Sequence, residues 1–96
     1  MTTEKFSRYD TADYLNTSED MALYLEACLE ENDPALIAHA LGVIVRARGG
    51  MTQLAKDTGI SRDGLYKALS ADGNPEFSTI LKVTRALGIR LHAEMV

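Results

Sequence analysis

Residues 51–70 read MTQLAKDTGISRDGLYKALS, and this stretch decides the expected fold. Its pattern predicts two short helices, over 52–58 and 62–69, that cross steeply through a tight turn. Gly59 can adopt the positive φ that such a turn needs, which would strain other residues. Ser61 is a suitable N-cap for the second helix and would leave its first turn facing outward.

The apolar residues of this segment have the spacing that contact between two helices requires. Ala55 lies where the helices would touch, and a larger side chain there would push them apart. Ile60 and Leu65 would fill the space between the helices, with Leu54 and Ala68 completing the contact. The segment therefore predicts a compact two-helix unit with one outward face.

Further helices are expected on both sides of this unit. One should begin at an N-cap on Ser18, with acidic residues in its first turn, and stop near Asn32. Asp33 and Pro34 then form a strong restart signal for a second apolar helix, which ends at Arg48 before two glycines. The last helix is expected over 77–87, with Ser78 or Thr79 as its cap.

The two ends of the chain have other patterns. Phe6 to Tyr9 could be a short extended piece, followed by a turn capped by Asp10 or Thr11. Residues 89–96 alternate apolar and polar side chains, which is typical of a strand with one apolar face. A lone strand is not stable, so this one would pair with residues 6–9, with its twin in a dimer, or with a partner chain.

Length and composition fit one small globular domain. The chain has 96 residues, of which 46% are hydrophobic and 25% charged, so it should fold around its own core. Its parts are an N-terminal helical extension with the first bundle helix (1–48), a helical core (49–88) and a terminal strand or tail (89–96). No segment approaches the roughly 20 apolar residues of a membrane span, and no export signal is found. With Cys28 as the only cysteine, a reducing, cytoplasmic location is expected.

The net charge of −4 hides an asymmetry between the two halves. Residues 1–45 hold two basic and nine acidic residues, whereas residues 46–96 hold eight basic and five acidic residues. The halves thus carry −7 and +3. Such a split suggests a basic face for phosphate and an acidic face for a basic partner, although acids that merely solvate surface helices would give the same count.

The 51–70 segment resembles the helix-turn-helix of lambda-repressor-like, Xre-type regulators. The whole chain is similar to addiction-module antidotes, the HigA-like antitoxins, through the opening FSRYDTADYL, the acidic SEDMALYLEACLEENDP and the run from GMTQLAKDTGIS to RALGIRL. The resemblance implies an all-α bundle of about five helices. It also implies the antitoxin of a type II toxin–antitoxin module, which neutralises a RelE/ParE-like toxin and represses its own operon as a dimer.

Candidate DNA-binding residues follow from the docking geometry of such motifs, in which the start of the second helix reaches base edges. Arg62 is the best candidate for paired hydrogen bonds to guanine. Asp63 and Gly64 count against DNA binding by this helix. The Asp63 carboxylate would be repelled by phosphate unless it accepts a hydrogen bond from cytosine or holds Arg62 in place, and Gly64 weakens the helix. The candidates on the second helix are Ser61, Arg62, Asp63, Tyr66 and Lys67, and those outside it are Thr52, Gln53 and Asn74.

The acidic first half is the expected surface for a basic toxin. The residues proposed to form it are Glu19, Asp20, Glu26, Glu30 and Glu31.

An enzyme is not expected, and neither a cofactor nor a metal is predicted. His39 and His92 lie far apart, Cys28 falls on an apolar helical face, and none of the common catalytic or metal-binding motifs occurs. Two alternatives to the antitoxin stay open. The chain could be a stand-alone Xre-type repressor without a toxin, or an antidote whose helix-turn-helix no longer binds DNA.

Overall fold

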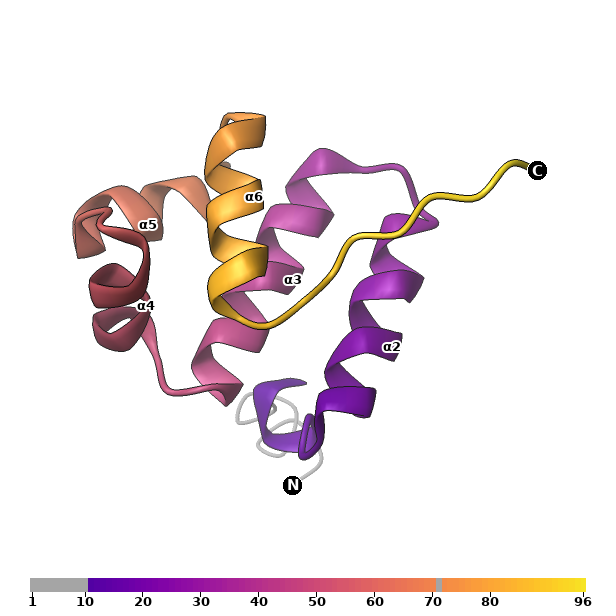
Figure 1. Ribbon diagram of the computed structural model, residues 1–96, viewed down its shortest axis with the longest axis horizontal. Coiled ribbons are helices and arrows are strands. Elements are labelled where there is room, and N and C mark those ends of the chain that lie inside the picture. Colours follow the sequence, from indigo (N-terminus) through magenta and orange to yellow (C-terminus); the bar gives the residue numbers. More distant parts are fainter. Residues whose placement is uncertain (1–10, 71) are drawn as a thin grey trace, which may run out of the picture.

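The computed structural model describes residues 11–70 and 72–96, and this part of the chain is helical without any strand (Figure 1). It confirms the expected all-α bundle. Its five α-helices follow a short 3-10 helix, and α3 and α6 lie between α2 on one side and the pair α4 and α5 on the other. The elements are η1 (Thr11–Tyr14), α2 (Ser18–Leu29), α3 (Pro34–Ala47), α4 (Met51–Thr58), α5 (Arg62–Ala68) and α6 (Phe77–Ala86).

The start of α2 is fixed by a reciprocal cap. Thr17 Oγ1 accepts a hydrogen bond from Asp20 N at 3.0 Å, and the Asp20 carboxylate accepts one from Thr17 N at 3.3 Å. This is a capping box that satisfies two backbone donors at the helix start. The predicted cap at Ser18 is therefore wrong by one residue. A capping box needs an acid three residues after the cap, and Asp20 stands in that position for Thr17 but not for Ser18.

The end of α2 also differs from the expectation. The helix ends at Leu29, and a turn follows in which Asn32 has a φ of 56°. Asparagine tolerates this left-handed conformation better than most residues. The restart is as predicted: the Asp33 carboxylate accepts from Ala35 N at 3.0 Å, and Pro34 opens α3.

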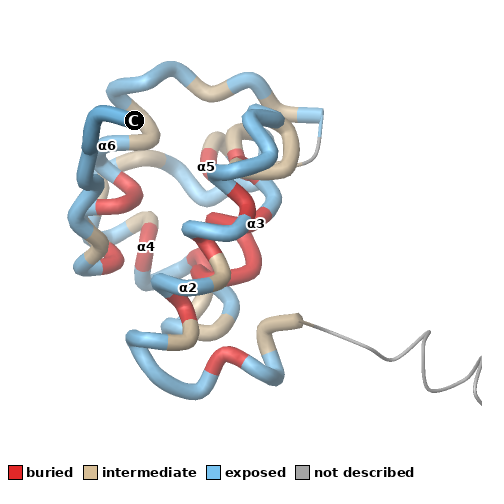
Figure 2. The backbone as a smooth tube through the Cα atoms, turned by 90° about the vertical axis from the view of Figure 1, so that its right-hand side faces the viewer, coloured by how far each residue is buried: buried red, intermediate tan, exposed pale blue. Residues whose placement is uncertain are grey.

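α3 forms the centre of the bundle. The run from Ala40 to Val45 is buried on every side, as expected of a helix that is apolar all round (Figure 2). Gly42 has a packing role in this run, since a Cβ there would lie 3.1 Å from Leu69 O. The largest fully buried side chains of the core are Leu41, Val43, Ile44, Val45, Leu65 and Val83.

The last helix and the tail depart from the expectation in two ways. α6 begins after an N-cap at Glu76 that makes no side-chain hydrogen bond, so neither Ser78 nor Thr79 is the cap. Residues 89–96 form no strand in the described chain, although their pattern alternates. Ile89 N donates to Thr84 O at 2.8 Å, which ties the tail to the end of α6, and the tail then runs across the bundle towards α2 (Figure 1). The predicted strand partner, residues 6–9, lies outside the described residues, as does the predicted cap at Asp10.

Candidate nucleic-acid interface

The turn between α4 and α5 has the predicted geometry. Gly59 adopts a φ of 76°, and its N–H donates to Ala55 O at 2.9 Å. Thr58 adds a second lock that the sequence pattern did not identify. Its hydroxyl donates to Leu54 O at 2.9 Å and accepts from Ile60 N at 3.2 Å, so the chain leaves α4 in a fixed direction.

The start of α5 is capped as expected. Ser61 Oγ accepts a hydrogen bond from Gly64 N at 3.0 Å. This contact also explains Gly64, which costs helical propensity. A Cβ at Gly64 would lie 3.1 Å from Ser61 Oγ and 3.4 Å from a methyl group of Ile60, so the glycine fits closely beneath the cap.

The inner side of the two-helix unit packs as the spacing predicts. Leu65 is fully buried and Leu54 is 3% exposed. Ala55, Ile60 and Ala68 are half-buried against the same cluster. Since these contacts fix the rotation of α5, they determine which of its side chains face outward.

Two pairs of side chains form the exposed face of α5. The guanidinium carbon of Arg62 lies 5.7 Å from the centre of the Tyr66 ring, within the range of a cation–π contact. Lys67 Nζ lies 3.4 Å from Asp63 Oδ2, with both side chains at least 80% exposed. Of the two roles considered for Asp63, the one of holding Arg62 in place is not what the structure shows, because the carboxylate pairs with Lys67.

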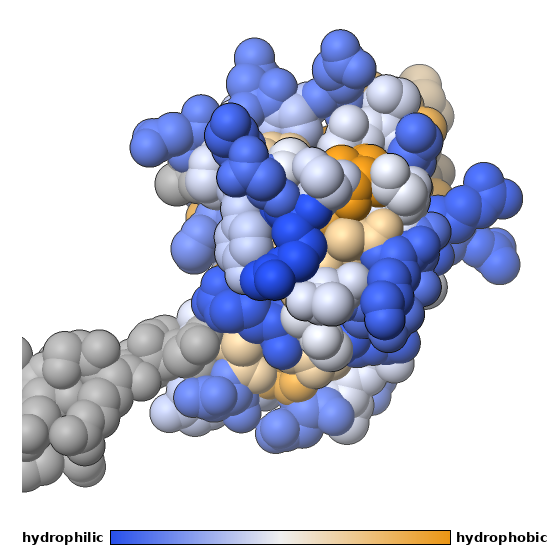
Figure 3. All heavy atoms as spheres, turned by 90° about the vertical axis from the view of Figure 1, so that its left-hand side faces the viewer, coloured by the Kyte–Doolittle hydropathy of each residue, from blue (hydrophilic) through white to orange (hydrophobic). Residues whose placement is uncertain are grey.

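The predicted residues on α4 lie at its start. Thr52 and Gln53 are both exposed, and Gln53 Nε2 donates to Asp57 Oδ1 at 3.0 Å, one turn further along α4. The side of the molecule that carries α4 and α5 in Figure 1 is mainly hydrophilic around a small apolar area (Figure 3). This surface suits a hydrated, polar partner such as a nucleic acid.

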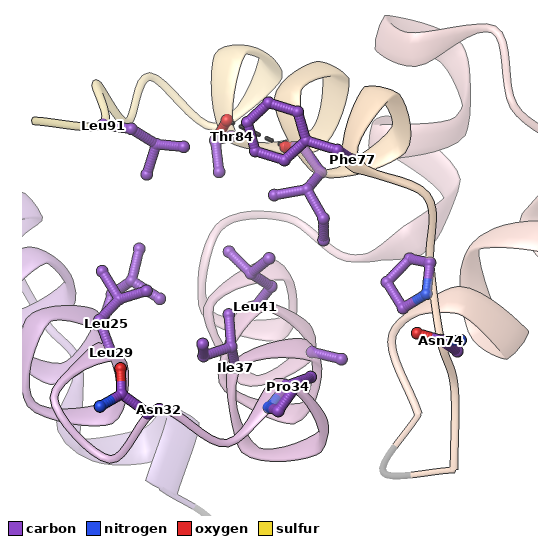
Figure 4. A pocket seen from close by; sticks show the side chains of 13 residues that line it. Leu25, Leu29, Asn32, Pro34, Ile37, Leu41, Asn74, Phe77, Thr84 and Leu91 are labelled. Atoms are coloured by element: carbon purple, nitrogen blue, oxygen red, sulfur yellow. Dashed lines mark hydrogen bonds between the residues drawn. The ribbon is translucent and has the colours of Figure 1, made fainter.

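Asn74 lies in a different setting from the residues on α5. It is exposed in the loop between α5 and α6, where it lines an apolar groove together with Leu25, Ile37, Phe77 and other side chains (Figure 4). The groove has a volume of about 370 Å³ and lies between α2, α3, α6 and the tail. Sequence reasoning missed this groove, because its lining comes from five separate segments, namely α2, α3 with the turn before it, the loop before α6, α6 and the tail.

The same loop contains a glycine that the sequence pattern did not single out. A Cβ at Gly73 would collide with Lys67 O and lie 2.5 Å from Ala68 O, so the loop packs directly on the last turn of α5. Gly73 therefore connects the course of the loop to the position of α5 and its exposed side chains.

The predicted acidic residues lie in three different settings. Glu19, Glu26 and Glu30 are exposed at positions seven and four residues apart, which places them in one stripe along α2, opposite the buried Met21 and Leu25. Asp20 lies off this stripe and is bound to the backbone of Asn16 and Thr17 at the cap. Glu31 is exposed in the turn after the helix.

The stripe also contains an exposed apolar side chain. Leu23 lies between Glu19 and Glu26 on the same face and is 60% exposed. Protein interfaces have an apolar core and a polar rim, so Leu23 offers an apolar contact within this polar surface.

The described residues also show where the cysteine, the histidine of α3 and the acidic side chains lie relative to one another. No group of three or more histidine, cysteine, aspartate or glutamate side chains that could hold a metal occurs among residues 11–70 and 72–96. Cys28 is buried, whereas His39 is exposed on α3. None of the described helices has the length and apolar character needed to cross a membrane.

The described chain is thus a small all-α protein that presents a polar two-helix unit on one side and an acidic helix on another. It belongs to the addiction-module antidote family: the model of the family described as "Probable addiction module antidote protein" matches residues 5–95. Membership supports a general antitoxin role, with a toxin as the partner.

Two further comparisons complete these findings. The chain is 48% identical over 92 residues to a protein of Haemophilus influenzae that is described only as an uncharacterised protein, and the match covers 96% of this chain and 94% of the relative. No solved structure matches the chain.

Proposed function

We propose that this protein is the antitoxin of a type II toxin–antitoxin module, that it neutralises a RelE/ParE-like toxin and that it binds operator DNA to repress its own operon. The observation that carries the DNA-binding part is the exposed face of α5. Arg62 and Tyr66 are held together there by their contact, on a helix whose rotation is fixed by the buried Leu65.

In this proposal α5 is the recognition helix of a lambda-repressor-like helix-turn-helix. Arg62 reads guanine in the major groove, and Tyr66 holds the guanidinium in place. Thr52 and Gln53 at the start of α4 and Asn74 in the loop contact phosphates, which position the protein without reading sequence. The operator is a pair of half-sites, so the binding species is a homodimer.

The acidic stripe on α2 supports the toxin-binding part. A toxin of this kind acts on a polyanion such as RNA and therefore presents a basic surface. Glu19, Glu26 and Glu30 offer the complementary charge and Leu23 an apolar contact. Since α2 and α5 lie on opposite sides of α3 and α6, one molecule can hold the toxin and the operator at once (Figure 1). The proposal includes a cytoplasmic location and a binding role without catalysis.

Co-expression with the product of the adjacent gene tests both parts. Copurification with a small basic protein supports the antitoxin, and a shift of the shared promoter that weakens steeply with salt supports operator binding. A stand-alone Xre-type repressor would shift the promoter without copurifying a toxin. An antidote that has lost DNA binding would copurify the toxin and leave the promoter unshifted.

A further inference from the structure

The groove beside α6 is surrounded by apolar side chains that solvent reaches. Phe77 and Leu81, one turn apart on α6, are 69% and 44% exposed. Leu29 on α2 and Leu91 in the tail line the same groove and are 39% and 40% exposed. Of these four side chains, Leu29, Phe77 and Leu91 line the groove, and Leu81 lies beside it on α6. A small protein rarely leaves an aromatic ring and leucines together in water around one hollow unless another molecule covers them.

A second hollow continues this surface along α6. It is lined by Leu81, Arg85 and Arg90 among others, and it shares Thr84 and Leu91 with the first groove. The two hollows therefore form one continuous face that runs from the turn between α2 and α3 to the end of α6. We call it the α6 face.

The charges of the α6 face differ between its two ends. At one end, the turn that contributes Asn32 and Pro34 to the groove also carries Glu31 and Asp33. At the other end lie Arg85 and Arg90. A two-fold axis through the apolar centre would exchange the ends and set the acidic end of one copy against the basic end of the other. A face with this distribution is complementary to itself, which is the requirement of an isologous interface.

We propose that the α6 face is the interface between two copies of this chain, with Phe77 as its most exposed aromatic contact. The tail extends the contact. Five residues follow Leu91, and in extended form they span roughly 16 Å, enough to carry the exposed Met95 onto the partner. The inference rests on the dimer of the proposed function and says where that dimer forms. A dimer through this face leaves α5, Glu19 and Glu26 uncovered, because no residue of α5 and neither of these glutamates lines the two hollows.

The test is the mass of the full chain in sedimentation equilibrium over the micromolar range. The wild type should be a dimer, and Phe77→Glu should weaken the association at least ~10-fold, because it puts a charge in place of an aromatic ring in the interface. Leu23→Glu is the matched control, since Leu23 is 60% exposed on α2 but lines neither hollow and should leave the dimer intact. Both side chains are largely exposed, so circular dichroism should show unchanged helix content.

Reversing charges at the two ends of the α6 face gives a second test of the dimer, which does not depend on an apolar residue. Arg85→Glu alone should weaken the dimer, and adding Glu31→Arg in the same chain should restore part of the loss. Removal of residues 89–96 should lower the dimer mass or the solubility.

Each opposite result overturns the proposal. A wild-type monomer throughout the range would do so, as would a Phe77→Glu dimer of wild-type affinity. If the chain alone is monomeric and Phe77→Glu abolishes copurification of the toxin, the α6 face belongs to the toxin. Failure of the proposed function has a different signature, namely a stable wild-type dimer that neither shifts the promoter nor binds a toxin.

Discussion

The guanidinium carbon of Arg62 lies 5.7 Å from the centre of the Tyr66 ring, one turn further along the exposed face of α5. Arg62 is thereby held over an aromatic surface, at a position where recognition helices contact bases. Arg62→Ala should weaken specific operator binding by ~1–3 kcal/mol and leave stability nearly unchanged, because the side chain is exposed. The measurement is a shift assay at fixed salt, with Lys82→Ala as a control that removes the same charge from α6. Equal operator affinity for Arg62→Ala and wild type would reject Arg62 as a base reader.

The role assigned to Tyr66 can be separated from that of Arg62. Tyr66→Phe keeps the ring and should bind the operator nearly as well as wild type. Tyr66→Ala removes the ring and should weaken binding by ~0.5–1 kcal/mol, the usual worth of a cation–π contact at an exposed site. In the double variant with Arg62→Ala, the effect of Tyr66→Ala should largely vanish. Additive losses would mean that Tyr66 contacts DNA by itself.

A change at Asp63 should strengthen DNA binding, whereas the changes at Arg62 and Tyr66 should weaken it. Its pair with Lys67 is almost fully exposed and contributes little to stability. Asp63→Asn removes a negative charge that faces the phosphates and releases Lys67, so non-specific DNA binding should become tighter and its salt dependence steeper. Titrations of an unrelated duplex at several salt concentrations measure both quantities. A salt slope no steeper than wild type would show that Lys67 does not reach the phosphates.

The packing of Gly73 on α5 leads to a stability prediction. A Cβ at Gly73 would collide with backbone atoms of Lys67 and Ala68, which cannot move without shifting the end of the helix. Gly73→Ala should therefore destabilise the protein by ~1–3 kcal/mol. Gly64→Ala is the comparison, because there the near atom is the rotatable Ser61 hydroxyl, and alanine gains up to ~1 kcal/mol of helical propensity. Urea unfolding of the two variants measures the difference, and equal midpoints would show that the loop yields easily.

The helices were predictable because their signals are local. Asp33 with Pro34, the turn at Gly59 and the cap at Ser61 each act within a few residues of the bond that they make, and all three were predicted from the sequence. The cap of α2 was placed one residue late because Thr17 and Ser18 are both good caps, and only the return bond from Asp20 selects between them.

What the sequence did not show depends on segments that are distant in the chain. The groove is assembled from α2, α3, the loop before α6, α6 and the tail, so no single window of the sequence contains its pattern. The tail was predicted as a strand because alternation gives the faces of an extended chain but says nothing about whether a second strand lies beside it. The pair of Asp63 and Lys67 is a local exception, because residues four apart lie on one side of a helix and the sequence analysis did not use this spacing.

The last prediction concerns the acidic stripe of α2 and the toxin. Glu19, Glu26 and Glu30 share one exposed face, whereas Asp20 is bound at the helix cap. Reversal of Glu19 and Glu26 to lysine should slow association with a basic toxin and make it less sensitive to salt, because the complementary field that speeds encounter is lost.

Two controls distinguish a binding effect from damage to the fold. Asp20→Lys changes the charge by the same amount per residue but breaks the capping box, so it should lower the unfolding midpoint more than it slows association. Operator binding should persist in the Glu19 and Glu26 variant, since α5 lies on the other side of the bundle (Figure 1). If paired reversals along the stripe leave toxin association unchanged at low salt, the acids only solvate α2. The toxin must then bind elsewhere, and the α6 face, with its exposed Phe77, would be the first surface to test.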